Sequence, residues 1–278
     1  MNPADGEAQK IDPCAVVGEV LGQPANEMRN PVNADYCCPF MNSICTKRSQ
    51  RIGGAFPVCS VFKSGKPCIE NLVAVCPKRF LAIELQEDVL AHCWVGGGLV
   101  NPRMVSEVKM SNLGMVDFVL ADFNEDLTLV RSFVSIELQA IDITGSYEPA
   151  YSALVHNQFL DKKPTYGFNW ANVRKRYITQ LINKGFFHHH WKTRIISVLQ
   201  DHVFERIQKD LCFEEIAVSR SDIVFLVYSF VHNDMDGGFT LNLSKVVGTS
   251  HNSLMMRVLY QHTPPREDFC KRIIERAT

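Results

Sequence analysis

Residues 134–147 read V-S-I-E-L-Q-A-I-D-I-T-G-S-Y. Apolar side chains alternate with polar ones in its first half, where the apolar positions are Val134, Ile136, Leu138 and Ala140. Successive side chains of a strand point to opposite faces of the sheet, so Glu137 and Gln139 project on the same face. The pattern predicts a half-buried strand that carries a polar pair.

A second strand-like run precedes this stretch and places Asp117 between Val116 and Phe118. On neighbouring strands, Asp117, Glu137 and the backbone carbonyl of Leu138 would form an oxygen-rich site that suits a hard divalent cation such as magnesium. A magnesium site of this kind suits phosphodiester hydrolysis. The alternative interpretation is that these are ordinary polar residues on the wet face of a sheet.

The stretch resembles the active-site strand of the NotI and EagI type of restriction endonuclease. This type is a variant of the PD-(D/E)xK nucleases in which glutamine replaces the usual lysine. The matching residues on the two strands are Glu137, Leu138, Gln139, Asp142, Gly145, Ser146, Tyr147 and residues 116–122. Further matches in the same order are the surroundings of Cys38, Cys45, Cys59 and Cys76, and the run 172–176 with Gln180. The resemblance extends from Cys38 to about Gln180.

This resemblance implies a type II restriction endonuclease of a restriction-modification system, which makes magnesium-dependent double-strand cuts at a short, GC-rich palindromic site. The catalytic residues would be Asp117, Glu137 and Gln139, and the magnesium ligands would be Asp117, Glu137 and Leu138. Cutting a palindrome implies a homodimer. Two alternatives remain open: a non-cleaving, metal-containing DNA-binding regulatory protein, and a repair or defence nuclease without palindrome specificity.

The expected fold is α/β (α+β), with a restriction-endonuclease-like mixed central sheet flanked by helices and a small N-terminal four-cysteine metal-binding lobe. The expected domains are an N-terminal region, 1–95, with the lobe at about 36–80, and a nuclease domain, 96–278. The first residues are polar and the longest apolar run, 223–231, is too short to cross a bilayer. We therefore expect a cytoplasmic protein without a small-molecule cofactor.

Ten cysteines in such a chain are more consistent with thiols or metal ligands than with disulfides. The spacing lacks the close C-x-x-C pairs of common zinc modules, so from spacing alone most could be buried free thiols. The resemblance implies a structural metal held by Cys38, Cys45, Cys59 and Cys76. It implies iron, and zinc would accept the same four thiolates. Cys37 is the alternative first ligand.

The formal net charge is only −1, but basic residues gather in one segment. Between Cys38 and Arg79 there is one acid, Glu70, against seven basic residues: Lys47, Arg48, Arg51, Lys63, Lys66, Lys78 and Arg79. A basic lobe fixed by a metal would suit contact with the phosphates of double-stranded DNA. A basic face that is merely solvated is the alternative.

Periodicity places the remaining elements. Helices are expected at 148–160, 170–184, 191–211 and after Pro264, and strands at 223–231 and 239–243, joined by a turn at 234–238. Asn169 would cap the second helix, on which Arg174, Lys175, Arg176 and Gln180 are candidates for DNA contact. His188, His189 and His190 are expected in a connecting loop, and Phe269 and Ile273 are expected to face inward.

Overall fold

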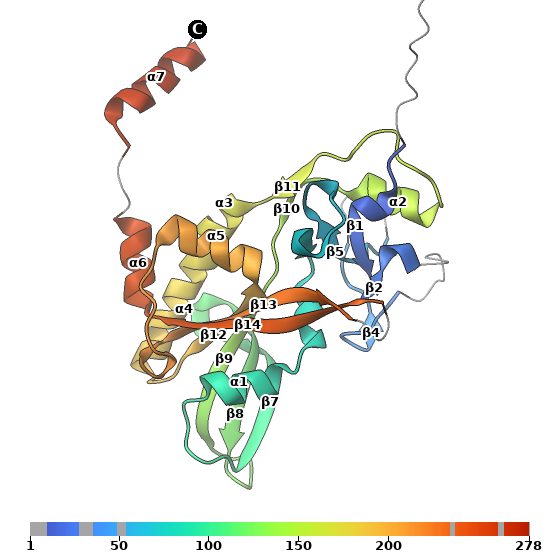
Figure 1. The fold of residues 1–278 in the computed structure, drawn as a ribbon. Helices are drawn as coiled ribbons and strands as arrows, with labels where there is room; N and C mark the ends of the chain where they lie inside the picture. Colours follow the sequence, from blue (N-terminus) through green and yellow to red (C-terminus); the bar gives the residue numbers. More distant parts are fainter. Residues whose placement is uncertain (1–9, 28–35, 49–53, 234–236, 261–263, 278) are drawn as a thin grey trace, which may run out of the picture.

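The centre of the molecule is a six-stranded sheet, and Glu137 lies on one of its inner strands (Figure 1). The computed structural model describes residues 10–27, 36–48, 54–233, 237–260 and 264–277. The strands are β7 (Asn101–Lys109), β8 (Met115–Phe123), β9 (Val130–Gln139), β12 (Ile195–Gln200), β13 (Ile223–His232) and β14 (Phe239–Thr249). Their order is β14-β13-β12-β9-β8-β7. β12 runs parallel to β9 and β13, and the other pairs are antiparallel, so the sheet is mixed.

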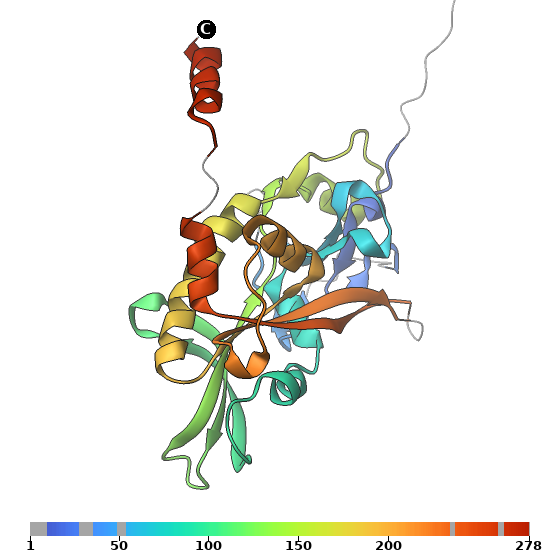
Figure 2. The same cartoon turned by 60° about the vertical axis from the view of Figure 1, so that its left-hand side comes forward.

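Helices cover both faces of this sheet (Figures 1 and 2). The main helices are α1 (Leu85–Cys93), α4 (Thr179–His190), α5 (Asp201–Leu211) and α6 (His251–Leu259). Leu85 and Val89 of α1 pack with Ile136 on one face. Leu181 of α4 and Phe204 of α5 pack with inward residues of β12 and β13 on the other. The structure thereby confirms the predicted fold class, a mixed α+β fold with a central sheet between helices.

The N-terminal part forms a second, smaller sheet with the order β2-β1-β5-β6. Its strands are β1 (Val17–Val20), β2 (Gln23–Pro24), β5 (Val58–Phe62) and β6 (Leu72–Ala74), beside the short pair β3 (Cys37–Cys38) and β4 (Ser43–Ile44). Helix α2 (Glu148–Val155) packs on this sheet through Ala150 and Leu154, although it follows β9 in the chain. The pair β10 (Ile143–Gly145) and β11 (Tyr166–Phe168) links β9 to the next helical segment.

Short helical elements complete the described chain. They are η1 (Pro13–Ala15), η2 (Ala25–Glu27), η3 (Lys63–Gly65), η4 (Ile69–Asn71), η5 (Pro77–Ala82), η6 (Ser111–Leu113), α3 (Trp170–Asn172), the π-helix η7 (Val173–Ile178) and η8 (Val218–Arg220). The side chain of Asn169 accepts a hydrogen bond from the Asn172 amide, which confirms the predicted cap. Because α3, η7 and α4 follow one another directly, the helical region expected to end at Lys184 continues to His190. The prediction of a loop at the three histidines was wrong.

The prediction of one helix at 191–211 was wrong in its first half, since residues 195–200 form strand β12. Every residue of this strand is buried, because it lies between β9 and β13 and is covered on both faces. A short apolar run buried on both faces does not alternate, so its period does not distinguish strand from helix. The helix begins at Asp201.

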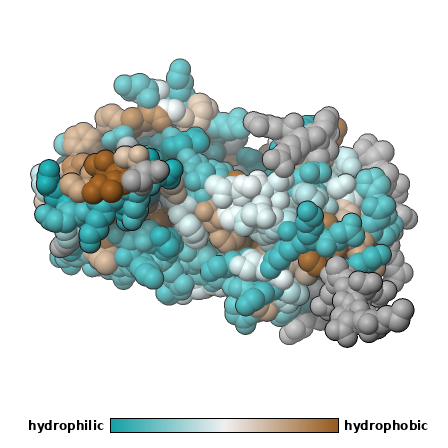
Figure 3. Space-filling model, turned by 90° about the horizontal axis from the view of Figure 1, so that it is seen from above, coloured by the Kyte–Doolittle hydropathy of each residue, from teal (hydrophilic) through white to brown (hydrophobic). Residues whose placement is uncertain are grey.

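The C-terminal helix α7 (Arg266–Ala277) stands away from the rest of the molecule (Figure 1). Phe269 is 66% exposed and Ile273 52% exposed, so the prediction that they face inward was wrong. Apolar surface is visible at the end of the molecule that carries α7 (Figure 3). The predicted strands at 223–231 and 239–243 are present as β13 and β14, whereas residues 234–236 of the expected turn lie outside the described residues.

In the described part of the chain, none of the helices combines the length and the apolar character that a membrane span requires.

Candidate active site

The antiparallel pairing of β8 and β9 brings Asp117 and Glu137 together. Phe118 pairs with Ile136 in the register of the two strands, so the next step outward sets Asp117 opposite Glu137. The Leu138 amide donates a hydrogen bond to Asp117 Oδ2 at 2.8 Å, which fixes the aspartate against the neighbouring strand. Both acidic residues are half-buried. The two carboxylates and the Leu138 backbone are therefore within one local cluster.

Helix α4 lies over the same face of β9 and adds a basic residue to the cluster. Lys184 Nζ forms an ion pair with Glu137 Oε1 and donates a second hydrogen bond to the Met115 carbonyl at 2.7 Å. One turn further along α4, His188 Nε2 lies 2.8 Å from Ser135 Oγ. Lys184 and His188 are four residues apart on the helix, and Glu137 and Ser135 are two apart on the strand, so each pair shares one face. These two faces of α4 and β9 pack against each other. The sequence interpretation missed Lys184.

The electrostatics of Glu137 reflect its surroundings. Burial raises the pKa of the Glu137 carboxyl above its usual value, the bonded Lys184 ammonium lowers it, and the nearby Asp117 carboxylate raises it again. A carboxylate pair with one buried ammonium therefore carries a net negative charge. Such a site attracts a cation.

Gln139 opens onto a cavity of about 250 Å³ beside this cluster. Asp142, Asn172, Arg176 and Gln180 also line it, so the structure brings two of the four candidate DNA-contacting residues to Gln139. Arg174 instead lines a separate hollow beside α5, and Lys175 is exposed. Arg176 belongs to the π-helix η7. Segments of π-helix are frequent at functional sites.

The whole region matches one family model. Residues 19–241 match the model described as restriction endonuclease NotI. The chain belongs to the NotI restriction endonuclease family. None of the curated proteins with which it was compared matches it. As a member of the NotI family, the chain is a site-specific deoxyribonuclease that acts on double-stranded DNA.

The matched region contains every candidate site residue of the chain, including Lys184. It ends within β14, before helices α6 and α7. The match thus covers most of the N-terminal sheet as well as the central sheet up to the start of β14. The C-terminal helices lie outside the match.

The four cysteines singled out by the NotI resemblance lie in and around the N-terminal sheet. All are free thiols, and in the described part of the chain no three of them bring their sulfur atoms within 4.8 Å of one another. They are nevertheless close enough to influence one another: burial raises the pKa of Cys45, and Cys76 and Cys38 raise it further. Burial raises the pKa of Cys59 to about 12, with Glu19 and Cys76 contributing. The structure therefore does not bring the four sulfur atoms together.

A different group of three possible ligands is assembled at the far end of α4. His189 Nδ1 lies 3.3 Å and His251 Nδ1 lies 2.5 Å from Asp222 Oδ2, and the His251 amide donates to Asp222 Oδ1 at 2.7 Å. These ligand atoms all lie within 4.8 Å of one another. Hydrogen bonds to the carboxylate already account for the arrangement.

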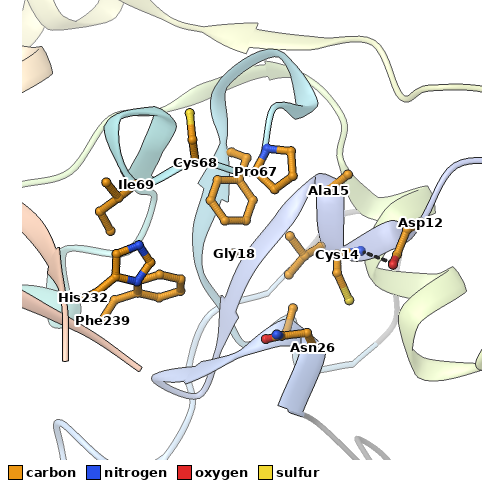
Figure 4. Close-up of a pocket in the computed structure, with 13 residues that line it drawn as sticks. Asp12, Cys14, Ala15, Gly18, Asn26, Pro67, Cys68, Ile69, His232 and Phe239 are labelled. Atoms are coloured by element: carbon orange, nitrogen blue, oxygen red, sulfur yellow. Dashed lines mark hydrogen bonds between the residues drawn. The ribbon is translucent and has the colours of Figure 1, made fainter. Parts of the chain in front are cut away.

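A further cavity of about 340 Å³ lies in the N-terminal part, between β1 and the tip of the β13–β14 hairpin (Figure 4). Asp12 and Cys14 lie on one side of it and His232 and Phe239 on the other. Neither Asp117 nor Glu137 lines this cavity.

The burial of His188 predicts an acid-sensitive fold. Burial lowers the pKa of the His188 imidazole to about 4, whereas an unfolded histidine titrates near 6.5. The unfolded chain therefore binds more protons between these values, so the contribution of His188 is complete above about pH 6.5 and is lost as the pH falls toward 4. The full loss is about 3 kcal/mol.

Urea unfolding of the wild type and of His188→Gln between pH 4 and 7 measures this effect. We expect the stability difference between the two proteins to shrink as the pH falls, because the glutamine does not take up a proton. A difference that is constant with pH would show that His188 is not buried in its neutral form.

Proposed function

We propose that the chain is a type II restriction endonuclease that makes magnesium-dependent double-strand cuts at a short, GC-rich palindromic site. The observation that carries this proposal is the placement of Asp117 opposite Glu137 across the β8–β9 pair. Membership of the NotI family supports the reaction class. The palindrome and its composition follow from the resemblance and are part of the proposal.

The residues present fit a magnesium ion. Hydrogen bonds described above engage Asp117 Oδ2 and Glu137 Oε1, so Oδ1 and Oε2 are the oxygens that we assign to the ion, together with the Leu138 carbonyl. Magnesium prefers such oxygen ligands and usually keeps several waters. When bound, it would polarise the scissile phosphate and make a bound water more acidic.

The protein's own side chains would orient the DNA around this site. Gln139 can hold a water or a phosphate oxygen through its amide, but it carries no charge and accepts no proton as a base. Arg176 and Gln180 line the same cavity, so we assign them contacts with phosphates or base edges. Arg174 and Lys175 would contact the DNA outside this cavity.

We retain a structural metal, iron or zinc, at Cys38, Cys45, Cys59 and Cys76 as part of the proposal. Burial raises the thiol pKa of Cys45 and of Cys59, so a metal would have to displace protons from these two cysteines, which makes its binding pH-dependent. The buried ammonium of Lys47 supports this site. Burial lowers its pKa, whereas the charges of Cys76, Cys59 and Cys45 raise it, so Lys47 would offset thiolate charge. It is fixed by the Val58 carbonyl at 2.6 Å.

A palindromic site has two-fold symmetry, so we propose that two copies of the chain act together. Each copy would supply one carboxylate cluster to one strand. We also propose a division into an N-terminal region, 1–95, whose lobe at about 36–80 carries the cysteines and basic residues for the DNA backbone, and a nuclease domain, 96–278.

Incubation with unmethylated plasmid and bacteriophage DNA, in magnesium or in EDTA, tests this function. The fragment ends are then sequenced. We expect discrete, magnesium-dependent ends that share one palindrome. Ends without a common sequence would favour a repair or defence nuclease, and intact DNA despite specific retention in a gel shift would favour a regulatory DNA-binding protein.

A further inference from the structure

The carboxylate cluster contains a cation that the strand does not provide. Asp117 and Glu137 bring two negative charges, and Gln139, two residues after Glu137 on the same face of β9, is neutral. In the described part of the chain, Lys184 is the basic side chain that forms an ion pair with this cluster. It comes from helix α4, 47 positions after Glu137.

The Lys184 ammonium is held in an environment that an ordinary surface lysine does not occupy. Its side chain is only 5% exposed, and two of its three N–H donors are engaged by Glu137 and the Met115 carbonyl. Removing an ammonium from water is costly unless the partner is well fixed. Glu137 and Met115 are fixed, because they belong to paired strands of the central sheet.

Arg176 is the alternative source of positive charge near Gln139. It lines the same cavity, but it is exposed and lies on η7, two turns before Lys184 along the helical region. Its position suits contact with bound DNA at the mouth of the cavity. Lys184 instead forms an ion pair with a carboxylate of the cluster, that of Glu137.

We propose that Lys184 supplies, from helix α4, the positive charge that Gln139 cannot supply from β9. The inference rests on the proposed function of the Asp117–Glu137 pair. In the protein without a divalent ion, the ammonium is the counter-ion of Glu137 and holds this carboxylate beside Asp117. When an ion engages Glu137, Lys184 stays beside the centre, where its positive charge offsets the charge of the DNA phosphate. Lys184 therefore positions Glu137 before the ion binds and offsets phosphate charge once the DNA is bound.

Lys184→Met should bind Mn²⁺ more tightly than the wild type and cut DNA more slowly. Titration calorimetry with Mn²⁺ and no DNA should give a dissociation constant at least tenfold lower than that of the wild type, because a competing positive charge is removed from the carboxylates. The single-turnover rate of DNA cleavage should fall about a hundredfold, because stabilisation of phosphate charge is lost. General damage to the structure would weaken Mn²⁺ binding as well as cleavage. Lys184→Arg should keep both values within about fivefold of the wild type.

Lys209→Met on the exposed face of α5 is the matched control and should change neither value. Glu137→Gln should weaken the Mn²⁺ binding, which assigns the measured heat to this site. If the methionine variant does not fold, Lys184→Gln gives the same comparison while keeping an N–H donor toward Glu137.

Unchanged Mn²⁺ affinity in a folded Lys184→Met protein would overturn the inference, as would a cleavage rate within threefold of the wild type. Loss of both properties in Lys184→Arg as well would also overturn it, because shape rather than charge would then matter. Failure of the wild type to cut DNA would instead refute the proposed function. The Mn²⁺ comparison would still decide whether Lys184 is the counter-ion of the carboxylates.

Discussion

Glu137→Gln is expected to lower the rate of DNA cleavage about a thousandfold at saturating magnesium, while specific DNA binding remains measurable. The substitution removes one of two negative charges that we assign to the metal site but keeps an oxygen near Lys184. That oxygen matters, because Glu137→Ala would leave the buried ammonium without its partner and would destabilise the fold as well. The amide variant therefore separates chemistry from stability.

Single-turnover cleavage and gel-shift affinity, measured on the same preparation, test this prediction. Glu205→Gln is the matched control, because Glu205 is exposed on α5 and takes no part in the site. Its cleavage rate should equal that of the wild type. Cleavage by Glu137→Gln at a tenth of the wild-type rate or faster would remove Glu137 from the catalytic site.

Arg79→Met is expected to lower the free energy of unfolding by about 3–5 kcal/mol. Arg79 forms a bidentate ion pair with Glu19, at 3.0–3.1 Å, and donates to the Phe239 carbonyl at 2.6 Å. Arg79 is 2% exposed and Glu19 is 0% exposed, so loss of the arginine leaves a buried carboxylate without its counter-ion. The pair also joins the N-terminal sheet to β14 of the central sheet.

Urea denaturation measures the loss, and Arg206→Met provides the control. Arg206 forms a similar 2.8 Å ion pair with Asp210, but on the exposed surface of α5, where such a pair contributes about 0.3–0.5 kcal/mol. The double variant Glu19→Met/Arg79→Met should regain part of the stability, because neither charge is then buried. Equal losses in the two single arginine variants would show that Arg79 is not buried in the folded protein.

The strand pair that carries the site could be predicted from the sequence, because alternation of polar and apolar residues on β8 and β9 has a local cause. The period of two identified the face that holds Asp117, Glu137 and Gln139. Strand β12 could not be predicted in the same way, since a strand buried on both faces has no polar alternation. What distinguishes it from a helix is its place between β9 and β13.

Lys184 could not be found by local pattern. Its role depends on how α4 packs against β9, a contact between residues far apart in the chain. The helix was expected to end at this lysine, which would have made it a frayed, solvated end. In the structure the helical region continues to His190, so Lys184 lies in its interior and faces the strand. Lys184 and His188 are four residues apart and both contact β9, so they share the face of α4 that meets this strand.

The exposed apolar side chains of α7 show a similar limit. The sequence of Arg266–Ala277 has an apolar face, but such a pattern does not encode whether the helix packs on the rest of its own chain. Burial was predicted for Phe269 and Ile273 because an apolar face usually packs on a core. Here these side chains are exposed.

We propose that Asp117 and Glu137 form the metal site of the enzyme. Anomalous scattering from crystals soaked in Mn²⁺ locates the ion directly. We predict a peak bound by both carboxylates and the Leu138 carbonyl. A protein whose manganese peak lies at His189, Asp222 and His251, with none between Asp117 and Glu137, would contradict the account.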